Sequence, residues 1–272
     1  MKVGFLTSIR QLNRPGNTII TIYLLDNSYC STEERYSAAL RQLNRPGNAI
    51  ITIYLLDNSY CSTEERHSEA LRQLYRPGNA IITIYLLDNS YCSTEERHSE
   101  ALRQLYCPGN AIITIYLLDN SYCSADERHS AALRQLYCPG NAIITIYLLD
   151  NSYCSTEERH SEALRQLYCP GNAIITIYLL DNSYCSTEER HSEALRQVYR
   201  PAIAIITIYL LDNSYCSADS RHSAALRQLY RCAIAIITIY LLDNSYCSAD
   251  SRHSAALRQL YRCAIAIITI YL

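Results

Sequence analysis

The sequence predicts an α/β fold, a right-handed βα solenoid in which strands and helices alternate around one parallel sheet. Three observations predict it. The seven prolines recur every 31 residues, each unit has a short β-branched segment, and each unit has a segment with helical periodicity. A fixed period in this range is typical of solenoids and closed repeat arrays. We therefore expect residues 1–272 to form a single repeat domain of about nine 31-residue units.

The composition indicates one short unit copied many times, and it excludes several classes of protein. The chain has 25 Tyr but one Phe, one Met and no Trp. Its net charge is −2 with no basic tract, so we expect no nucleic-acid partner. Its apolar runs are too short for a membrane helix, so we expect no membrane partner. The odd number of 13 Cys, with no C-x-x-C pair, favours a reducing, cytoplasmic location.

The first element of each unit is a predicted strand. The segment Ala49–Leu56 reads A-I-I-T-I-Y-L-L, which is short, β-branched and without a helix start signal. Its copies place the predicted strands near residues 18–25, 49–56, 80–87, 111–118, 142–149, 173–180, 204–211, 235–242 and 266–272.

The rest of each unit predicts a turn followed by a helix. Asp57-Asn58-Ser59 has the side chains that favour turns. Ser62 and Glu65 match a helix capping box, so we expect a helix over Thr63–Tyr75, ended by Pro77-Gly78. The apolar stripe of that helix would consist of His67, Ala70, Leu71, Leu74 and Tyr75.

Parallel strands joined by helices allow two architectures. One is an open horseshoe with the sheet inside and the helices outside. The other is a closed eight-fold βα barrel, because eight units give about 250 residues, the usual size of such barrels.

The strand pattern favours the horseshoe. The spacing of Ile50, Ile53, Leu55, Asn58 and Tyr60 resembles the leucine-rich-repeat signature L-x-x-L-x-L-x-x-N-x-L. The following helix makes the chain similar to the ribonuclease-inhibitor-like subclass. This resemblance implies a concave sheet that binds protein partners, and a buried asparagine ladder bonded to turn backbone. The 31-residue period exceeds the usual 20–29 residues of the family.

One tyrosine recurs in every predicted strand and marks the candidate binding site. Strand alternation puts Tyr54 on the face opposite Ile53 and Leu55, which is the concave face in a horseshoe. A stripe of tyrosines with flanking leucines is typical of an interface, although cross-strand packing is the alternative. The predicted partner-binding residues are Tyr85, Tyr116, Tyr147, Tyr178, Tyr209, Leu118 and Leu149.

Histidine and cysteine also recur in fixed positions. His67 and its copies suggest a metal site, but packed helices lie about 8–10 Å apart, too far for adjacent histidines to share an ion. We therefore expect no metal and no cofactor. Cys61 and its copies are expected to be reduced thiols, with a disulfide between stacked turns as the alternative.

These observations predict a non-enzymatic repeat scaffold that binds a protein partner through its concave sheet. Catalysis is not expected, because every unit repeats the same side chains and none carries a unique acid, base or nucleophile. The alternative is an orphan translated tandem repeat with no defined partner. Neither end has a polar capping unit, so we also expect self-association through the uncapped ends.

Overall fold

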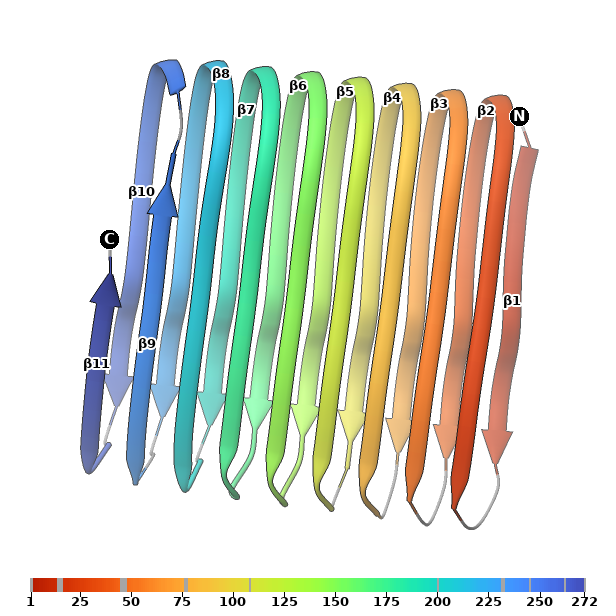
Figure 1. Cartoon of the computed structure of the whole chain (residues 1–272). Helices are drawn as coiled ribbons and strands as arrows, with labels where there is room; N and C mark the ends of the chain where they lie inside the picture. Colours follow the sequence, from red (N-terminus) through yellow and green to blue (C-terminus); the bar gives the residue numbers. More distant parts are fainter. Residues whose placement is uncertain are drawn as a thin grey trace.

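Between residues 18 and 230, each 31-residue unit folds as one long, bent strand (Figure 1). The next unit contains two separate strands. The computed structural model describes residues 2–13, 17–44, 48–75, 78–107, 109–199, 201–230, 233–244, 246–261 and 263–271. Across these ranges the chain forms strands and no helix, and therefore no helix long and apolar enough to span a membrane. The strands are β1 Lys2–Asn13, β2 Thr18–Asn44, β3 Ala49–Tyr75, β4 Ala80–Tyr106, β5 Ala111–Tyr137, β6 Ala142–Tyr168, β7 Ala173–Tyr199, β8 Ile203–Tyr230, β9 Ile234–Asp243, β10 Tyr246–Tyr261 and β11 Ile265–Tyr271.

The turns stack in parallel and in perfect register. Each residue pairs with its copy 31 positions away, as Ala111 does with Ala142 and Tyr137 with Tyr168. Figure 1 shows each long strand running along one layer, bending over, and returning along a second layer. In β4 we name Ala80–Asn89 the first limb, Ser90–Arg97 the arch and His98–Tyr106 the second limb, and we use the same names in every turn. The result is a two-layered β-solenoid.

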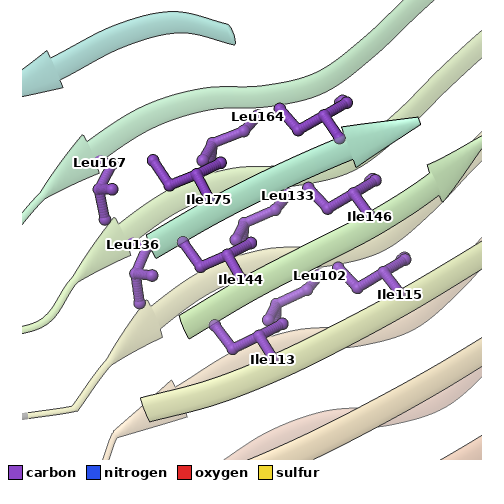
Figure 2. Close-up of a cluster of buried hydrophobic side chains, with 14 of the residues drawn as sticks. Leu102, Ile113, Ile115, Leu133, Leu136, Ile144, Ile146, Leu164, Leu167 and Ile175 are labelled. Atoms are coloured by element: carbon purple, nitrogen blue, oxygen red, sulfur yellow. The ribbon is translucent and has the colours of Figure 1, made fainter. Parts of the chain in front are cut away.

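The core lies between the two layers. The first limb of β5 alternates, with Ile113 and Ile115 buried and Ile112 exposed. The second limb of β4 contributes Ala101, Leu102 and Leu105, which are also buried. Figure 2 shows isoleucines from first limbs packing against leucines from second limbs along the stack. Because every turn repeats this arrangement, the core is continuous from one turn to the next.

A glycine occupies the corner that joins one turn to the next in the central turns. An added Cβ on Gly140 would lie 2.5 Å from the carbonyl oxygen of Gly109 and 2.7 Å from its carbonyl carbon. The stacked corners of Gly109 and Gly140 therefore leave no room for a side chain. Pro77, part of the predicted helix stop, lies outside the described residues, as does Leu272 at the end of the last predicted strand.

The prediction of an α/β fold is wrong, both as a βα horseshoe and as a closed eight-fold barrel. The segment Thr63–Tyr75, expected to be a helix, is the second half of β3. The sheet is also open, because the strand order runs from β1 at one edge to β11 at the other. Only the parallel solenoid with a 31-residue period is confirmed.

The helical pattern identified buried residues of the second limb, but it predicted the wrong backbone conformation for them. Ala70, Leu71 and Leu74 are buried, as the stripe predicted. The prediction is wrong for Tyr75, which is 49% exposed, and His67 is half-buried. Ser, Thr and His are weak helix formers, and each turn has identical neighbours that satisfy its backbone through interstrand hydrogen bonds. Stacking of identical copies therefore overrides the local helix signal, and Ser62 and Glu65 form no capping box.

Candidate interaction surface

The outward side chains of the first limbs form one flat surface, which we name the tyrosine face. In β5 its residues are Ile112, Thr114, Tyr116 and Leu118, and the same four positions recur in the other turns. Ile112 is 42% exposed, and the other three are half-buried. The alternating strand pattern thus places the tyrosines outside, as the sequence predicted. The turns in Figure 1 stack in a straight row, so this face is not the concave surface of a horseshoe.

The tyrosine rings stack on one another along the whole face. Ring centroids of successive turns are 4.6 to 4.8 Å apart, and the ring planes agree within 4°. This separation equals the spacing of neighbouring strands, so each ring is half covered by its copies. Partial burial raises the pKa of the Tyr178 hydroxyl, with Tyr147 and Tyr209 adding to the rise. The Tyr178 hydroxyl therefore stays a neutral hydrogen-bonding group at physiological pH.

The structure brings all the predicted partner-binding residues onto the tyrosine face. The five tyrosines belong to one uninterrupted ladder, and each leucine lies two residues beyond a ladder tyrosine on the same strand. These residues are Tyr85, Tyr116, Tyr147, Tyr178, Tyr209, Leu118 and Leu149. Their role in binding a partner stays a prediction.

Asparagine forms a second ladder next to the arch. The Nδ2 group of Asn120 donates to Oδ1 of Asn89 at 2.9 Å, and Asn151 repeats this bond to Asn120 at 2.9 Å. An asparagine ladder is therefore present, but the expectation of a buried ladder bonded to turn backbone is wrong. Its bonds differ from the expectation, because they join side chains to side chains and the amides are half-buried.

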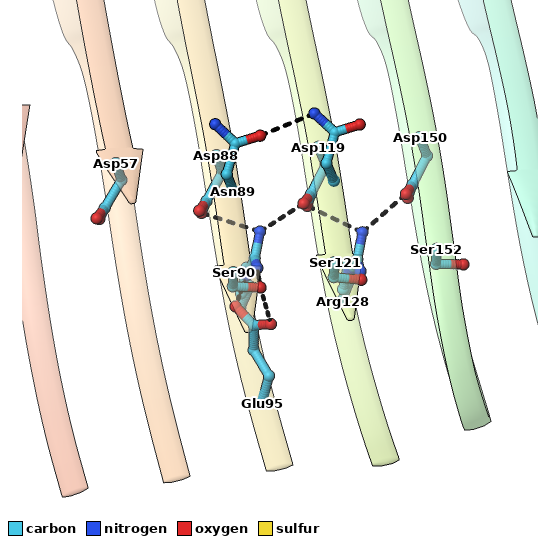
Figure 3. A network of polar contacts seen from close by, with 12 residues as sticks. Asp57, Asp88, Asn89, Ser90, Glu95, Asp119, Ser121, Arg128, Asp150 and Ser152 are labelled. Carbon is cyan, nitrogen blue, oxygen red and sulfur yellow. Dashed lines mark hydrogen bonds and ion pairs between the residues drawn. The ribbon is translucent and has the colours of Figure 1, made fainter. Parts of the chain in front are cut away.

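The arch encloses a network of buried charges (Figure 3). Nη1 of Arg97 lies 3.0 Å from Oδ2 of Asp88 in its own turn and 2.5 Å from Oδ1 of Asp119 in the next. Arg128 repeats this bridge between Asp119 and Asp150. Arginine and aspartate therefore alternate in a chain of ion pairs along the stack.

Each arch contains a second carboxylate, so the carboxylates outnumber the arginines in every turn. Glu95 is buried, accepts a hydrogen bond from Ser90 at 2.5 Å and pairs with Nε of Arg97. Each turn thus buries one guanidinium against two carboxylates, an excess of one negative charge per turn. Burial accordingly raises the pKa of Asp150 to about 6, against the opposing effect of Arg128 and Arg159.

A narrow cavity runs beside these aspartates. Its lining consists of the leucine, aspartate and serine copies represented by Leu117, Asp119 and Ser130. This explains why the Asp150 side chain is 20% exposed although it lies inside the solenoid. That exposed surface faces the cavity.

The buried thiols offer two possible sets of metal ligands, Glu64–Cys92–Glu95 and Glu95–Cys123–Asp126, but their surroundings oppose both. Glu64, Cys92 and Glu95 bring a thiol and two carboxylates within 4.8 Å, and all three residues are buried. The guanidinium of Arg97 already pairs with Glu95, so a second cation would be repelled there. The Cys92 thiol donates to Glu64 at 3.2 Å.

The cysteines are thiols in most described positions. Cys263, which lies in the column of Pro77 and is not a copy of Cys61, is disulfide-bonded. The side chains of Cys30 and Cys61 lie outside the described residues. The described cysteines that are not in a disulfide are Cys92, Cys107, Cys123, Cys138, Cys154, Cys169, Cys185 and Cys216.

The buried arginines and aspartates were not singled out from the sequence. A signal existed, because Arg97 and Asp88 have an identical residue in every complete unit, whereas the Glu100 position alternates between Glu and Ala. The predicted helical stripe did not include these arginines. A strand that bends at this point turns them inward.

Comparison of this chain with protein-family models, curated proteins and solved structures finds no match.

Proposed function

We propose that this chain is a non-enzymatic repeat scaffold that binds a protein partner across its tyrosine face. The observation that carries the proposal is the uninterrupted ladder of stacked rings, flanked by isoleucine side chains that are 41 to 42% exposed in the central turns. Tyrosine combines a large apolar ring with a hydroxyl, and it is enriched where binding energy concentrates. Free thiols in the central turns support a cytoplasmic setting.

The geometry favours a partner with a flat surface. The two-layered turns stack straight, so the face is planar and its rows repeat at the strand spacing. Two flat sheets pack face to face at about 10 Å through interdigitated side chains. A flat sheet of another protein is therefore the best-matched partner.

The test is a comparison of two tyrosine ladders in the same molecule. Tyr116→Ser with Tyr147→Ser disrupts the tyrosine face, where these rings stack at 4.7 Å. Tyr137→Ser with Tyr168→Ser disrupts a ladder on the second limb, where the rings stack at 4.8 Å. Each purified protein is used to capture partners, and each captured protein is then titrated as a purified component. We expect the first pair alone to weaken saturable binding, by about 2 kcal/mol or more.

Unfolding midpoints separate a structural role from a binding role. Both double variants remove similar stacking and should lower the midpoint similarly. Equal loss of binding in the two variants would contradict the tyrosine face as the site. If no captured protein binds saturably, the scaffold function itself is wrong.

Self-association is the second candidate function, favoured by the edges of the sheet. In the described part of the chain β11 pairs with β9 alone, and all seven of its residues are exposed. At the other edge Ile19 is 76% exposed. Exposed apolar edge strands pair readily with another chain. Sedimentation of this polypeptide over a concentration series should show growing oligomers that Ile267→Lys abolishes; oligomers that persist in the variant would exclude these edges.

A further inference from the structure

Histidine and glutamate form a continuous exposed strip along the second limbs. Glu96 and His98 lie side by side, with Oε1 and Nε2 3.5 Å apart, and Glu127 and His129 repeat the pair at 3.7 Å. We name the five such pairs the His–Glu strip. They are Glu65–His67, Glu96–His98, Glu127–His129, Glu158–His160 and Glu189–His191, with separations of 3.5 to 3.7 Å.

The stacking distance removes the objection raised by the sequence. The histidines lie on strands, and successive imidazole rings are 4.8 to 4.9 Å apart, about half the separation expected for packed helices. Two neighbouring turns therefore bring two imidazoles and two carboxylates into one small region. Their side chains are accessible, with His129 39% and Glu127 52% exposed.

We propose that the His–Glu strip binds divalent transition-metal ions of the zinc, cobalt, nickel and copper class. A tetrahedral ion with bonds of roughly 2 Å holds its donor atoms roughly 3.3 Å apart. The separation within each pair is already close to this value, so one carboxylate and one imidazole need little movement. Rotation of the neighbouring exposed side chains supplies the third and fourth donors. Imidazole nitrogen selects these metals over calcium and magnesium, which prefer oxygen ligands.

The charges around the strip do not oppose a cation. The groove that contains the histidines also contains arginines, represented by Arg103 and Arg165. Arg103 pairs with Glu100 at 2.7 Å, and Arg165 pairs with Glu162 at 3.0 Å. The six arginines of the groove share four glutamates outside the strip, which leaves two positive charges in excess. The five carboxylates of the strip outnumber this excess and can balance an ion.

The sequence limits the strip to five pairs and supplies an internal control. The first unit has Tyr36 where the others have His, and Ser220 and Ser251 replace Glu in the turns of His222 and His253. If each ion uses two neighbouring pairs, the strip holds about two ions per chain.

The test is calorimetric titration of the whole reduced chain with zinc in excess magnesium. His98→Gln with His160→Gln leaves no two neighbouring pairs intact, whereas His222→Gln with His253→Gln removes as many histidines from turns without the glutamate. We expect zinc binding to weaken at least about tenfold in the first variant and to stay unchanged in the second. Circular dichroism confirms that both variants are folded.

Cobalt spectroscopy identifies the donor atoms independently of affinity. The proposal predicts visible d–d bands of a nitrogen–oxygen site, and these bands should be lost in the His98→Gln, His160→Gln variant. Thiolate-to-cobalt charge-transfer bands would assign the metal to cysteine and overturn the proposal. Equal weakening in the two histidine variants, or no zinc binding by the unaltered chain, would also overturn it.

Discussion

Each arch buries an arginine whose charge has to be compensated inside the solenoid. Arg128 is 2% exposed at its side chain and bridges Asp119 and Asp150 at 3.1 and 2.8 Å. Burial of an isolated charge is costly, and here each arginine is compensated from two turns at once. The ion-pair chain therefore fixes the register between turns as well as the bend within each turn.

Replacement of Arg128 by Met should destabilise the chain strongly. Three carboxylates, Asp119, Asp126 and Asp150, would lose their shared partner inside the solenoid. Removing one member of a buried charge network costs about 3–5 kcal/mol. The matched control is Arg165→Met, which breaks the more exposed pair with Glu162 and should cost at most about 1 kcal/mol. Equal losses in denaturant unfolding would show that the arch charges contribute no more than surface pairs.

The excess carboxylates make stability depend on pH. Burial raises the pKa of Asp150 to about 6, and of Asp212 to about 6, above the ordinary value of 3.8. A raised carboxyl pKa stabilises the folded state below the unfolded value and loses that contribution as the pH rises through the folded value. The charges facing Asp150 are Arg128, Arg159, Asp119 and Asp181.

Asp150→Asn isolates this contribution, because asparagine copies the shape of the protonated acid. We expect the free energy of unfolding of the variant, relative to that of the unaltered chain, to increase as the pH rises from about 4 to about 6. Urea unfolding of both proteins across this range measures the difference. If the free energy of unfolding of the variant instead decreases relative to that of the unaltered chain as the pH rises, Asp150 is ionised across the whole range.

At the scale of the element, the sequence predicted the first limb correctly and the second limb wrongly. The alternation of Ile51, Thr52 and Ile53 has a strand period, and the structure confirms it. In the second limb Ala70 and Leu71 are both buried, which breaks the strand alternation and imitates a helical stripe. The tyrosine face was therefore predictable from the local pattern. The arch charges were not, because they depend on a bend that no local signal indicates.

Gly140→Ala should disturb the corner between turns. The added methyl group would meet the backbone of Gly109 in the adjacent corner, and neither backbone can move without breaking the register. Overpacking of this kind costs about 1–3 kcal/mol. Ala202→Gly is the control, because that corner already accommodates a Cβ, and it should cost at most about 1 kcal/mol. An unchanged unfolding midpoint for Gly140→Ala would contradict the close corner stacking.

At the scale of the whole molecule, identity between turns determines the architecture. Tyrosine, asparagine, glutamine and histidine each contact their own copies in the next turn. Gln104, for example, donates a hydrogen bond to Gln135 at 2.9 Å. Such ladders form only when the register equals the repeat length. The 31-residue period was visible in the sequence. That the chain forms stacked strands and not βα units is a result of contacts between copies.

Far-UV circular dichroism of the folded chain tests the central claim, that each turn is one bent strand without a helix. The two-layered β-solenoid predicts a β-type spectrum with a single minimum and no helical double minimum, lost cooperatively on unfolding. A helical double minimum of the strength expected from one helix over Thr63–Tyr75 and each of its copies would contradict it.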